Sequence, residues 1–305
     1  MDRSDVTLER MRSFVRVAER GSFSAVAREM GVGQATVSRH VAELEQALGT
    51  TLINRTTRRL SLTPEGGRYH EDARAVLRLV EEAAEGLYRA SDALSGSVRV
   101  SCTAALGVRQ VARALFAFQD RHPRVEIDLK LTDTRIDLVQ EAADIAIRLG
   151  TLTDSSMQRK HVGLSRRILV ASRDYLERHG TPTSPDDLRQ HRTIRMSNVA
   201  DSGTLVLQGP DRSMATVPFG DRLLLDHGLA AREAIVQGRG IAPAHLWLID
   251  DLLDIGAIVK VLPDHRLEPV PLSILAAPGR LRIQRVRLLV DSLTAFLRGL
   301  PGVAN

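Results

Sequence analysis

Hydrophobic positions in the first fifty residues recur three and four apart, which is the period of an amphipathic α-helix. This pattern predicts helices over about 8–20, 23–30 and 34–48. Gly21 would end the first helix, and the glycine-rich turn 31–33 would separate the second from the third. Two short helices joined by a tight turn are typical of a helix-turn-helix, although an ordinary helical hairpin shares the pattern.

The third of these helices would present short polar side chains in its first turns. Its polar side carries Gln34, Thr36, Ser38, Arg39 and His40. Short side chains let a helix backbone approach base edges in the major groove, where Gln pairs with adenine and Arg with guanine. The candidate DNA-binding residues of this helix are Gln34, Ala35, Thr36, Ser38 and Arg39.

Two short β-prone runs follow at 51–55 and 59–63. Residues 46–63 contain arginine but no acidic residue. A two-stranded wing with arginines at its tip can lie along a phosphate backbone or enter a narrow minor groove. The candidate DNA contacts of the wing are Arg55, Arg58 and Arg59.

A long helix is predicted next, because Thr63 can cap it, Pro64 suits its first position and Glu65 suits its first turn. Apolar positions then alternate four and three apart as far as residue 94, which is a heptad seam. The seam residues are Tyr69, Ala73, Val76, Val80, Ala83, Leu87, Ala90 and Leu94. The strict 3.5-residue period favours pairing with a second chain over packing of a surface helix on its own domain.

Beyond a boundary at 95–97, strands and helices alternate, which predicts an α/β domain with a parallel sheet. Strands are expected near 98–102, 125–131, 144–148, 165–171, 193–195, 204–207, 214–217 and 272–276. Helices are expected near 108–120, 136–141, 173–179 and 228–237, after 184, and near 286–297.

Composition narrows the class of protein. Hydrophobic residues make up 43% and charged residues 26%, which is globular. The start of the chain has no apolar signal-peptide core, and no apolar run reaches the ~18 residues of a membrane span, so we expect a soluble cytoplasmic protein. Only three of the 42 basic residues are lysine. Either the base composition of the genome or an anionic partner would explain the excess of arginine. In residues 46–63, where no acidic residue balances the arginines, an anionic partner is the favoured explanation.

The sequence offers no catalytic or cofactor motif. It has no G-x-S-x-G, H-E-x-x-H or P-loop pattern, and its paired glycines lack the third glycine of a dinucleotide fingerprint. The single cysteine, Cys102, excludes a disulfide framework and fits a small apolar strand residue better than a nucleophile. The nine histidines show no paired ligand spacing, so neither a metal, a cofactor nor a catalytic residue is expected.

Several stretches of the chain resemble the LysR-type transcriptional regulators. In the first part these are Phe14-Val15-x-Val17-Ala18-Glu19-x-Gly21-Ser22-Phe23, Val37-Ser38-Arg39-x-Val41-x-x-Leu44-Glu45 and Arg55-Thr56-Thr57-Arg58-x-Leu60-x-Leu62-Thr63-x-Glu65-Gly66. Later ones are Asp144-x-Ala146-Ile147-Arg148-x-Gly150 and Gly238-x-Gly240-Ile241-Ala242. The chain departs from the family pattern at Gly33, Ala35 and Ile53, and again around 103–107. Ala35 falls on the DNA-facing start of the third helix. This departure therefore affects which operator sequence is expected, and leaves the expectation of DNA binding unchanged.

The resemblance implies an α plus α/β protein with three parts. These are a winged helix-turn-helix DNA-binding domain (1–63), a linker and dimerisation helix (64–94) and an effector-binding domain (95–305) like a type 2 periplasmic binding protein. Its two subdomains would be 95–161 with 268–305, and 162–267. The implied partners are double-stranded promoter DNA with an interrupted inverted repeat, a small-molecule effector, and a second chain in a homodimer or homotetramer. RNA polymerase is a further candidate partner.

Ligands of open α/β sheets bind beyond the carboxyl ends of the strands. The candidate effector-binding residues at such ends are Ser101, Cys102, Thr103, Thr132, Asp133, Arg148, Met196 and Ser197. A helix N-terminus and a guanidinium both favour an anion, so a small organic acid or a similar polar metabolite is expected. Arg148 could instead form a structural salt bridge.

A second class of function stays open, namely a solute-binding protein or an α/β enzyme with a helical N-terminal appendage. The missing signal peptide argues against solute transport, and the missing catalytic motif argues against an enzyme. A ligand-controlled, DNA-binding regulator is therefore the favoured interpretation.

Overall fold

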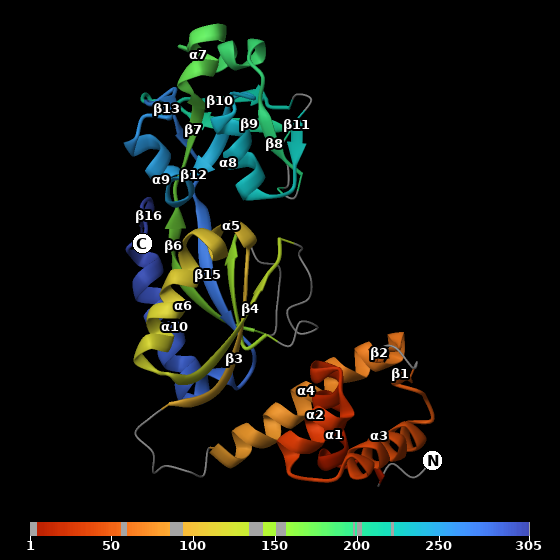
Figure 1. Cartoon of the computed structure of the whole chain (residues 1–305). Helices are drawn as coiled ribbons and strands as arrows, with labels where there is room; N and C mark the ends of the chain where they lie inside the picture. The colour runs from red at the N-terminus through yellow and green to blue at the C-terminus, as the bar shows by residue number, and fades with distance from the viewer. Residues whose placement is uncertain are drawn as a thin grey trace. The chain divides into compact units, whose positions relative to one another are not determined.

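A computed structural model of the chain describes residues 5–55, 60–85, 94–133, 143–150, 157–197, 199, 203–220 and 223–304 (Figure 1). Its internal contacts divide the chain into two compact units, Met1–Ser91 and Asp92–Asn305. No helix among the described residues is both long enough and apolar enough to cross a bilayer. The helix expected near 136–141 lies outside the described residues.

The first unit begins with the three helices that the sequence predicts: α1 (Leu8–Arg20), α2 (Phe23–Met30) and α3 (Gln34–Leu48). Gly21 ends α1 and Gly31 ends α2, with φ angles of 62° and 67° that glycine adopts without steric cost. Gly33 precedes α3 in an extended conformation and supplies no side-chain cap. The predicted bounds of all three helices are confirmed. Prediction succeeds here because a glycine at the end of each helix acts as a local stop signal.

The wing consists of β1 (Ile53–Arg55) and β2 (Leu60–Leu62), which pair antiparallel. Thr63 fixes the exit from the wing, since its hydroxyl donates to the Thr51 carbonyl (2.8 Å) and accepts from the Gly66 N–H (2.9 Å). A Cβ atom on Gly66 would lie 2.0 Å from the Leu52 carbonyl oxygen. Only glycine therefore lets the next helix start so close to the wing.

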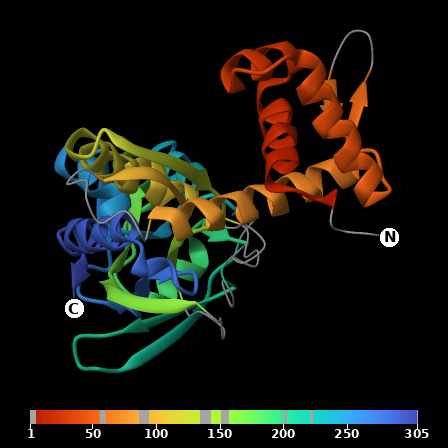
Figure 2. The same cartoon turned by 90° about the horizontal axis from the view of Figure 1, so that it is seen from below.

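Helix α4 (Pro64–Glu85) follows, one continuous helix in Figure 2. Ala73 and Leu77 are buried in the core of the first unit, together with Phe14, Val37 and Leu44. Tyr69 packs against the same core, so the first part of the predicted heptad seam packs within its own chain.

The rest of the seam behaves differently. Val76 and Val80 are each 38% exposed, and the neighbouring Leu79 is 56% exposed. Leu87 and Ala90 lie outside the described residues. Leu94 is not helical, and its side chain packs on the core of the second unit, so the predicted end of the seam is wrong.

The second unit contains a six-stranded sheet in the order β16-β6-β15-β5-β3-β4. Its strands are β3 (Ser95–Cys102), β4 (Arg124–Leu131), β5 (Ile145–Leu149), β6 (Gln158–Ser165), β15 (Val270–Ala276) and β16 (Val303–Ala304). β3 is parallel to β4 and β5, as predicted, but β15 is antiparallel to β5 and β6. The predicted parallel sheet is therefore confirmed for β3, β4 and β5 and wrong for β15, because no crossover helix returns the chain to this sheet in the parallel direction.

Helices cover this six-stranded lobe. After β3 the chain forms α5 (Ala104–Leu106), a π-helical turn η2 (Gly107–Val111) and α6 (Ala112–Arg121), where the sequence predicts one helix. α10 (Gln284–Arg298) follows the short turn η4 (Arg280–Arg282) and packs beside α6 (Figure 1).

A second lobe is built around β7 (Arg167–Ser172), which pairs antiparallel with β12 (Ala242–His245) and β13 (Ile258–Val261). The other strands of this β7 lobe are β8 (Ile194–Met196), β9 (Thr204–Gln208), β10 (Met214–Pro218), β11 (Leu223–Leu225) and β14 (Arg266–Leu267). Its helices are α7 (Arg173–His179), η3 (Pro185–Gln190), α8 (Gly228–Val236) and α9 (Leu246–Asp254). The predicted strand 165–171 corresponds to β7, two residues early at its start. The sequence analysis does not predict β6, β11, β12, β13, β14, β16 or α9.

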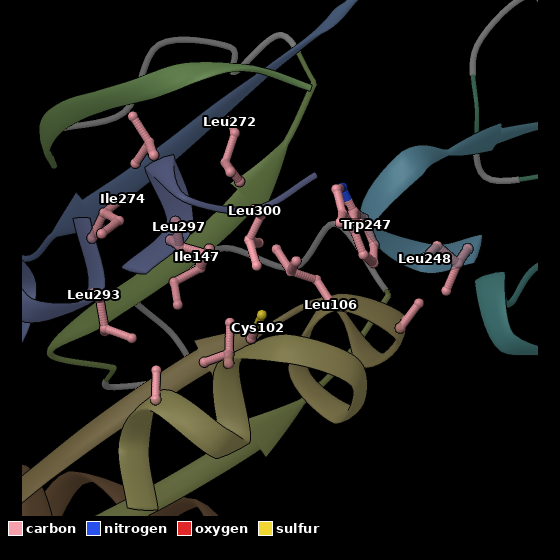
Figure 3. Close-up of a cluster of buried hydrophobic side chains, with 14 of the residues drawn as sticks. Cys102, Leu106, Ile147, Trp247, Leu248, Leu272, Ile274, Leu293, Leu297 and Leu300 are labelled. Carbon is pink, nitrogen blue, oxygen red and sulfur yellow. The ribbon is translucent and has the colours of Figure 1, made fainter. Parts of the chain in front are cut away.

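The two lobes share one hydrophobic core. Figure 3 shows Trp247 of the β7 lobe lying toward Leu106 and Leu300 of the six-stranded lobe. The indole N–H of Trp247 donates to the Ser165 hydroxyl (2.9 Å), which also bonds to Nδ1 of His245 (2.8 Å). Burial and the nearby Arg167 lower the pKa of His245 to about 3, so this ring stays neutral. The crossing from β6 to β7 is thus fixed by a neutral hydrogen-bonded cluster.

Candidate functional site

The start of α3 presents the polar surface that the sequence predicts. Gln34 and Ala35 are exposed, and the side chain of Arg39 is 66% exposed. Thr36 and Ser38 are half-buried on the flank of the helix. The first turns of α3 therefore offer short or uncrowded side chains that a DNA groove could receive.

His40 does not belong to this surface. It is 8% exposed, and its Nδ1 lies 2.8 Å from the hydroxyl of the fully buried Ser13. Because α1 packs against this side of α3, the prediction that His40 lies on the polar face is wrong. His40 instead fixes α3 against α1.

The charges around α3 are loosely held. Arg39 approaches Glu43 at 4.0 Å, one helical turn away, and Glu43 also pairs with Arg10 at 2.9 Å. Exposed ion pairs of this kind contribute roughly 0–1 kcal/mol. Exchange of the carboxylate for a base edge or a phosphate would therefore cost Arg39 little.

Glu45 connects α3 to the wing, a role that the sequence does not reveal. Its Oε1 accepts the N–H groups of Leu52 (2.8 Å) and Ile53 (3.0 Å), at the start of β1. The backbone of Arg55 lies at the end of β1, whereas Arg58 and Arg59 lie outside the described residues. The carboxylate therefore holds helix and wing in a fixed relation.

In the second unit, most of the predicted effector-binding residues meet at the carboxyl ends of β3, β4 and β5. Nη2 of Arg148 donates to the Ser101 hydroxyl at 2.7 Å, which ties β5 to β3. The Thr132 N–H donates to the Cys102 carbonyl (2.9 Å), which ties β4 to β3. The parallel pairing of these three strands brings the groups to one edge, as expected.

Cys102 contributes only its backbone to this edge. Its side chain is fully buried in the hydrophobic core (Figure 3), and burial raises the pKa of its thiol to about 12. The interpretation of Cys102 as a small apolar strand residue therefore fits, and its side chain is removed from the candidate effector contacts.

Asp133 changes the expected electrostatics of the site. Its Oδ1 accepts the N–H of Ala104 at 3.1 Å, so this carboxylate occupies the helix start that we expected a ligand anion to use. Among the described residues, the buried Thr103 hydroxyl and Asp133 Oδ2 have no hydrogen-bond partner. The edge thus offers a carboxylate and a hydroxyl beside the guanidinium of Arg148.

His227 is a site residue that the sequence analysis missed. Its Nε2 lies 3.6 Å from Asp133 Oδ2, across the two lobes, and its Nδ1 accepts the N–H of Leu229 (3.2 Å) at the start of α8. An accepting Nδ1 places the proton of the neutral ring on Nε2, facing the carboxylate. The sequence offered one signal for His227, since it directly precedes the predicted apolar helix 228–237.

The two lobes touch next to this histidine. A Cβ atom on Gly228 would lie 2.9 Å from the Cβ atom of Ala105. Glycine at this position therefore lets α8 approach α5 closely.

Met196 and Ser197 lie elsewhere on the β7 lobe. Met196 ends β8 and is paired with Leu225 of β11, and the Ser197 N–H donates to the Leu225 carbonyl (2.8 Å). No hydrogen bond or ion pair within the described part of the chain joins either residue to the edge of β3, β4 and β5. Nor do the described residues contain a group of three His, Cys, Asp or Glu side chains placed to hold a metal ion.

Comparison with known proteins decides the family. Residues 8–67 match the bacterial regulatory helix-turn-helix protein, lysR family, and residues 91–298 match the LysR substrate binding domain. The chain is a LysR-type transcriptional regulator. The predicted fold class, a helix-turn-helix followed by an effector-binding domain, is confirmed.

This LysR-type regulator has full-length relatives. It is 32% identical over 287 residues to an HTH-type transcriptional regulator of Xanthomonas campestris, covering 93% of the chain and 83% of the relative. It is 31% identical over 291 residues to the regulator CrgA of Neisseria meningitidis, covering 95% and 96%. The full-length structure of AphB, a virulence activator of Vibrio cholerae, matches with a TM-score of 0.62 and 26% identity over 95% of this chain and 99% of AphB.

Proposed function

We propose that this LysR-type regulator reads promoter DNA with α3 in the major groove and its wing on the adjacent backbone. The observation that carries the proposal is the exposed start of α3, with Gln34, Ala35 and Arg39, held to the wing by Glu45. Gln34, Thr36, Ser38 and Arg39 would contact bases or phosphates, and Arg55, Arg58 and Arg59 would contact phosphates. In this role the regulator would work in the cytoplasm, with its DNA.

Fluorescence anisotropy with the full chain and DNA from upstream of its own gene tests this proposal. A specific site should bind about 10³-fold or more tightly than unrelated DNA of equal length. Equal affinity for both DNAs at physiological salt would contradict sequence-specific regulation through α3.

We propose that two chains pair through the second half of α4, in a homodimer that can assemble further into a tetramer. Val76, Leu79 and Val80 are exposed apolar residues on this helix, although the chain's own core uses Ala73 and Leu77. A two-fold dimer presents two helix-turn-helices, which suits an interrupted inverted repeat. The proposed parts therefore stay 1–63 for DNA binding, 64–94 for linkage and 95–305 for effector binding, with RNA polymerase as a further partner.

Substitution of Val80 by Asp tests the dimer, because it would place a charge in the paired surface without touching the first unit's core. Light scattering of the full chain should show a lower mass for this variant at micromolar concentration. Arg68→Asp is the matched control, since Arg68 is 76% exposed on the same helix and should leave the mass unchanged. An unchanged mass for Val80→Asp would place the dimer interface elsewhere.

We propose further that the effector is a small organic acid that also carries a hydroxyl or amino group, bound at the edge of β3, β4 and β5. Arg148 and Ser101 suit its carboxylate, and Asp133 with Thr103 suits its hydrogen-bond donor. The carboxylate of Asp133 would repel an acid that lacks such a donor.

A thermal-shift screen of the full chain with paired acids tests this class, for example 2-hydroxy acids against the same acids without the hydroxyl. A ligand that binds only the folded protein raises the melting temperature. We expect hydroxy or amino acids to stabilise the chain more than their unsubstituted partners. The opposite ranking would contradict the role given to Asp133.

A further inference from the structure

A cavity lies between α6, α9 and α10, formed by residues other than those at the strand ends. It has a volume of about 700 Å³ and is open to solvent on one side. α6 and α10 belong to the six-stranded lobe, whereas α9 belongs to the β7 lobe (Figure 1). The walls of this cavity therefore come from both lobes.

The π-helical turn η2 shapes one wall. It carries Arg109 and Gln110, and the Gln110 side chain donates to the Trp247 carbonyl at 2.8 Å, which fixes η2 against the start of α9. π-helical turns are uncommon and frequently occur at functional sites. Here the turn places Arg109 and Gln110 in the wall of the cavity.

Three charged groups at one wall of the cavity already pair with one another. Arg109 binds Asp251 at 2.9 Å, and Arg232 binds the same carboxylate with both nitrogens at 2.7 and 3.0 Å. Two arginines on one carboxylate make a rigid wall, and they lower the pKa of Asp251 despite its partial burial. These groups connect η2 and α8 through α9, and together they leave one positive charge, which adds to the attraction for an anionic group.

Two other charges in the cavity lining remain for a ligand. Arg113 of α6 lies with its guanidinium 5.4 Å from the centre of the Phe296 ring, and Asp250 comes from α9. Neither makes an ion pair or hydrogen bond with the residues that the structure describes. The cavity thus carries one positive and one negative group on different helices.

The end of α10 and the residues after it supply the apolar part of the lining. Phe296 and Leu300 contribute side chains, and α10 ends here at Gly299, where its last carbonyls favour a positive charge. We propose that this cavity binds a free α-amino acid with an apolar side chain. Arg113 would bind the carboxylate, Asp250 would bind the ammonium group, and the side chain would lie on Phe296 and Leu300.

An amino acid bound here would touch both lobes and would favour one arrangement of them. Asp133 at the strand ends also lies where the two lobes meet, since His227 approaches it there. A ligand at each site could therefore affect the other, and the coupling can be no larger than the preference of each ligand for one arrangement of the lobes. This second site goes beyond the proposed function and does not depend on the identity of the effector.

Isothermal titration of the full chain with L-leucine, L-methionine and L-phenylalanine tests the proposal. Blocked forms of the same ligand, N-acetyl-leucine and leucine amide, each remove one charge. We expect at least one free amino acid to bind with a micromolar to millimolar Kd and each blocked form to bind at least tenfold more weakly. Absence of binding by all three amino acids at millimolar concentration would overturn the proposal.

Variants locate the binding. Arg113→Gln and Asp250→Asn should each weaken the amino acid at least tenfold. Arg121→Gln is the matched control, because Arg121 also lies on α6 with its guanidinium 6.0 Å from a phenylalanine ring, but it does not line the cavity. Arg148→Ala should also leave this binding unchanged. Loss of binding in Arg148→Ala with full binding in both cavity variants would place the amino acid at the strand ends and overturn the second site.

Discussion

The two binding surfaces of this regulator hold their polar groups in different ways. On α3, Gln34 is exposed, and Arg39 lies 4.0 Å from Glu43, its one ionic neighbour among the described residues. At the ends of β3 and β5, Arg148 bonds to Ser101 at 2.7 Å, while Asp133 bonds to the backbone of Ala104. The polar groups of the first surface are exposed to solvent, whereas those of the second are hydrogen-bonded to other groups of the same chain.

This difference affects how substitutions should be interpreted. Exposed groups with few partners contribute to binding nearly independently, and their removal leaves folding stability almost unchanged. Groups that share hydrogen bonds are coupled, so one substitution changes its neighbours as well. The predictions below test whether this contrast holds.

The largest effect is expected at the strand ends. Arg148→Ala should weaken effector binding by about 1.5–3 kcal/mol, because it removes charged hydrogen bonds. A double-mutant cycle with Ser101→Ala, measured by titration calorimetry, should show that the two substitutions are not additive. Binding to operator DNA without effector should stay near that of the parent.

Thr103→Val provides the control for Arg148→Ala. It keeps the shape of the side chain and removes a buried hydroxyl without a partner among the described residues, so it should lower effector affinity without lowering the free energy of unfolding. Normal responses to the true effector in both variants would place the pocket elsewhere.

Next in size is the effect of Arg39→Ala on DNA binding. We expect a loss of about 1–3 kcal/mol for the specific operator and a smaller loss for unrelated DNA, because a base contact is lost. The free energy of unfolding from urea titration should change by less than ~0.5 kcal/mol, since Arg39 is exposed. Unchanged operator affinity and site preference would remove Arg39 from the base-reading set.

A smaller effect is expected from the wing. Arg58→Ala should reduce the slope of log K against log salt by about one unit, which is the loss of one phosphate contact. Its loss of affinity should be similar for specific and unrelated DNA. A loss of affinity with an unchanged salt slope would show that Arg58 does not contact phosphate.

The smallest predicted effect concerns the start of α3. Gly33 has φ −70° and ψ 146°, and a Cβ atom added to it would have one neighbour within 4 Å, the Thr36 hydroxyl oxygen at 3.9 Å. Gly33→Ser should therefore add a side-chain cap and raise stability by a few tenths of a kcal/mol. Gly31→Ala is the contrast, because φ of 67° makes alanine unfavourable, and it should lower the melting temperature. A destabilised Gly33→Ser would contradict this account of the helix start.

The sequence predicts best where the determinants are local. The bounds of α1, α2 and α3 follow from Gly21, Gly31 and the helical period, all within a few residues of each element. The wing follows from two β-prone runs, and its pairing of Ile53 with Leu62 joins positions that are close together in the chain.

Prediction fails where the determining contact is distant in the chain. β15 joins β5 and β6 from more than a hundred residues away, so its antiparallel direction has no local signal. The bond from Asp133 to Ala104 spans 29 residues, and the approach of His227 to Asp133 requires the two lobes to meet. The first part of the heptad seam fails for a related reason, since Ala73 is buried by the helices of its own unit.

The buried Cys102 has a practical consequence for experiments. Alkylating and spin-labelling reagents attack thiolates, and a fully buried thiol with a pKa of about 12 provides almost none near neutral pH. Because Cys102 is also the single cysteine of the chain, the natural protein should not react with thiol-directed labels. Cysteines introduced on α8 and α6 would carry spectroscopic probes alone, and the distance between the two labels would report how the lobes move when a ligand binds.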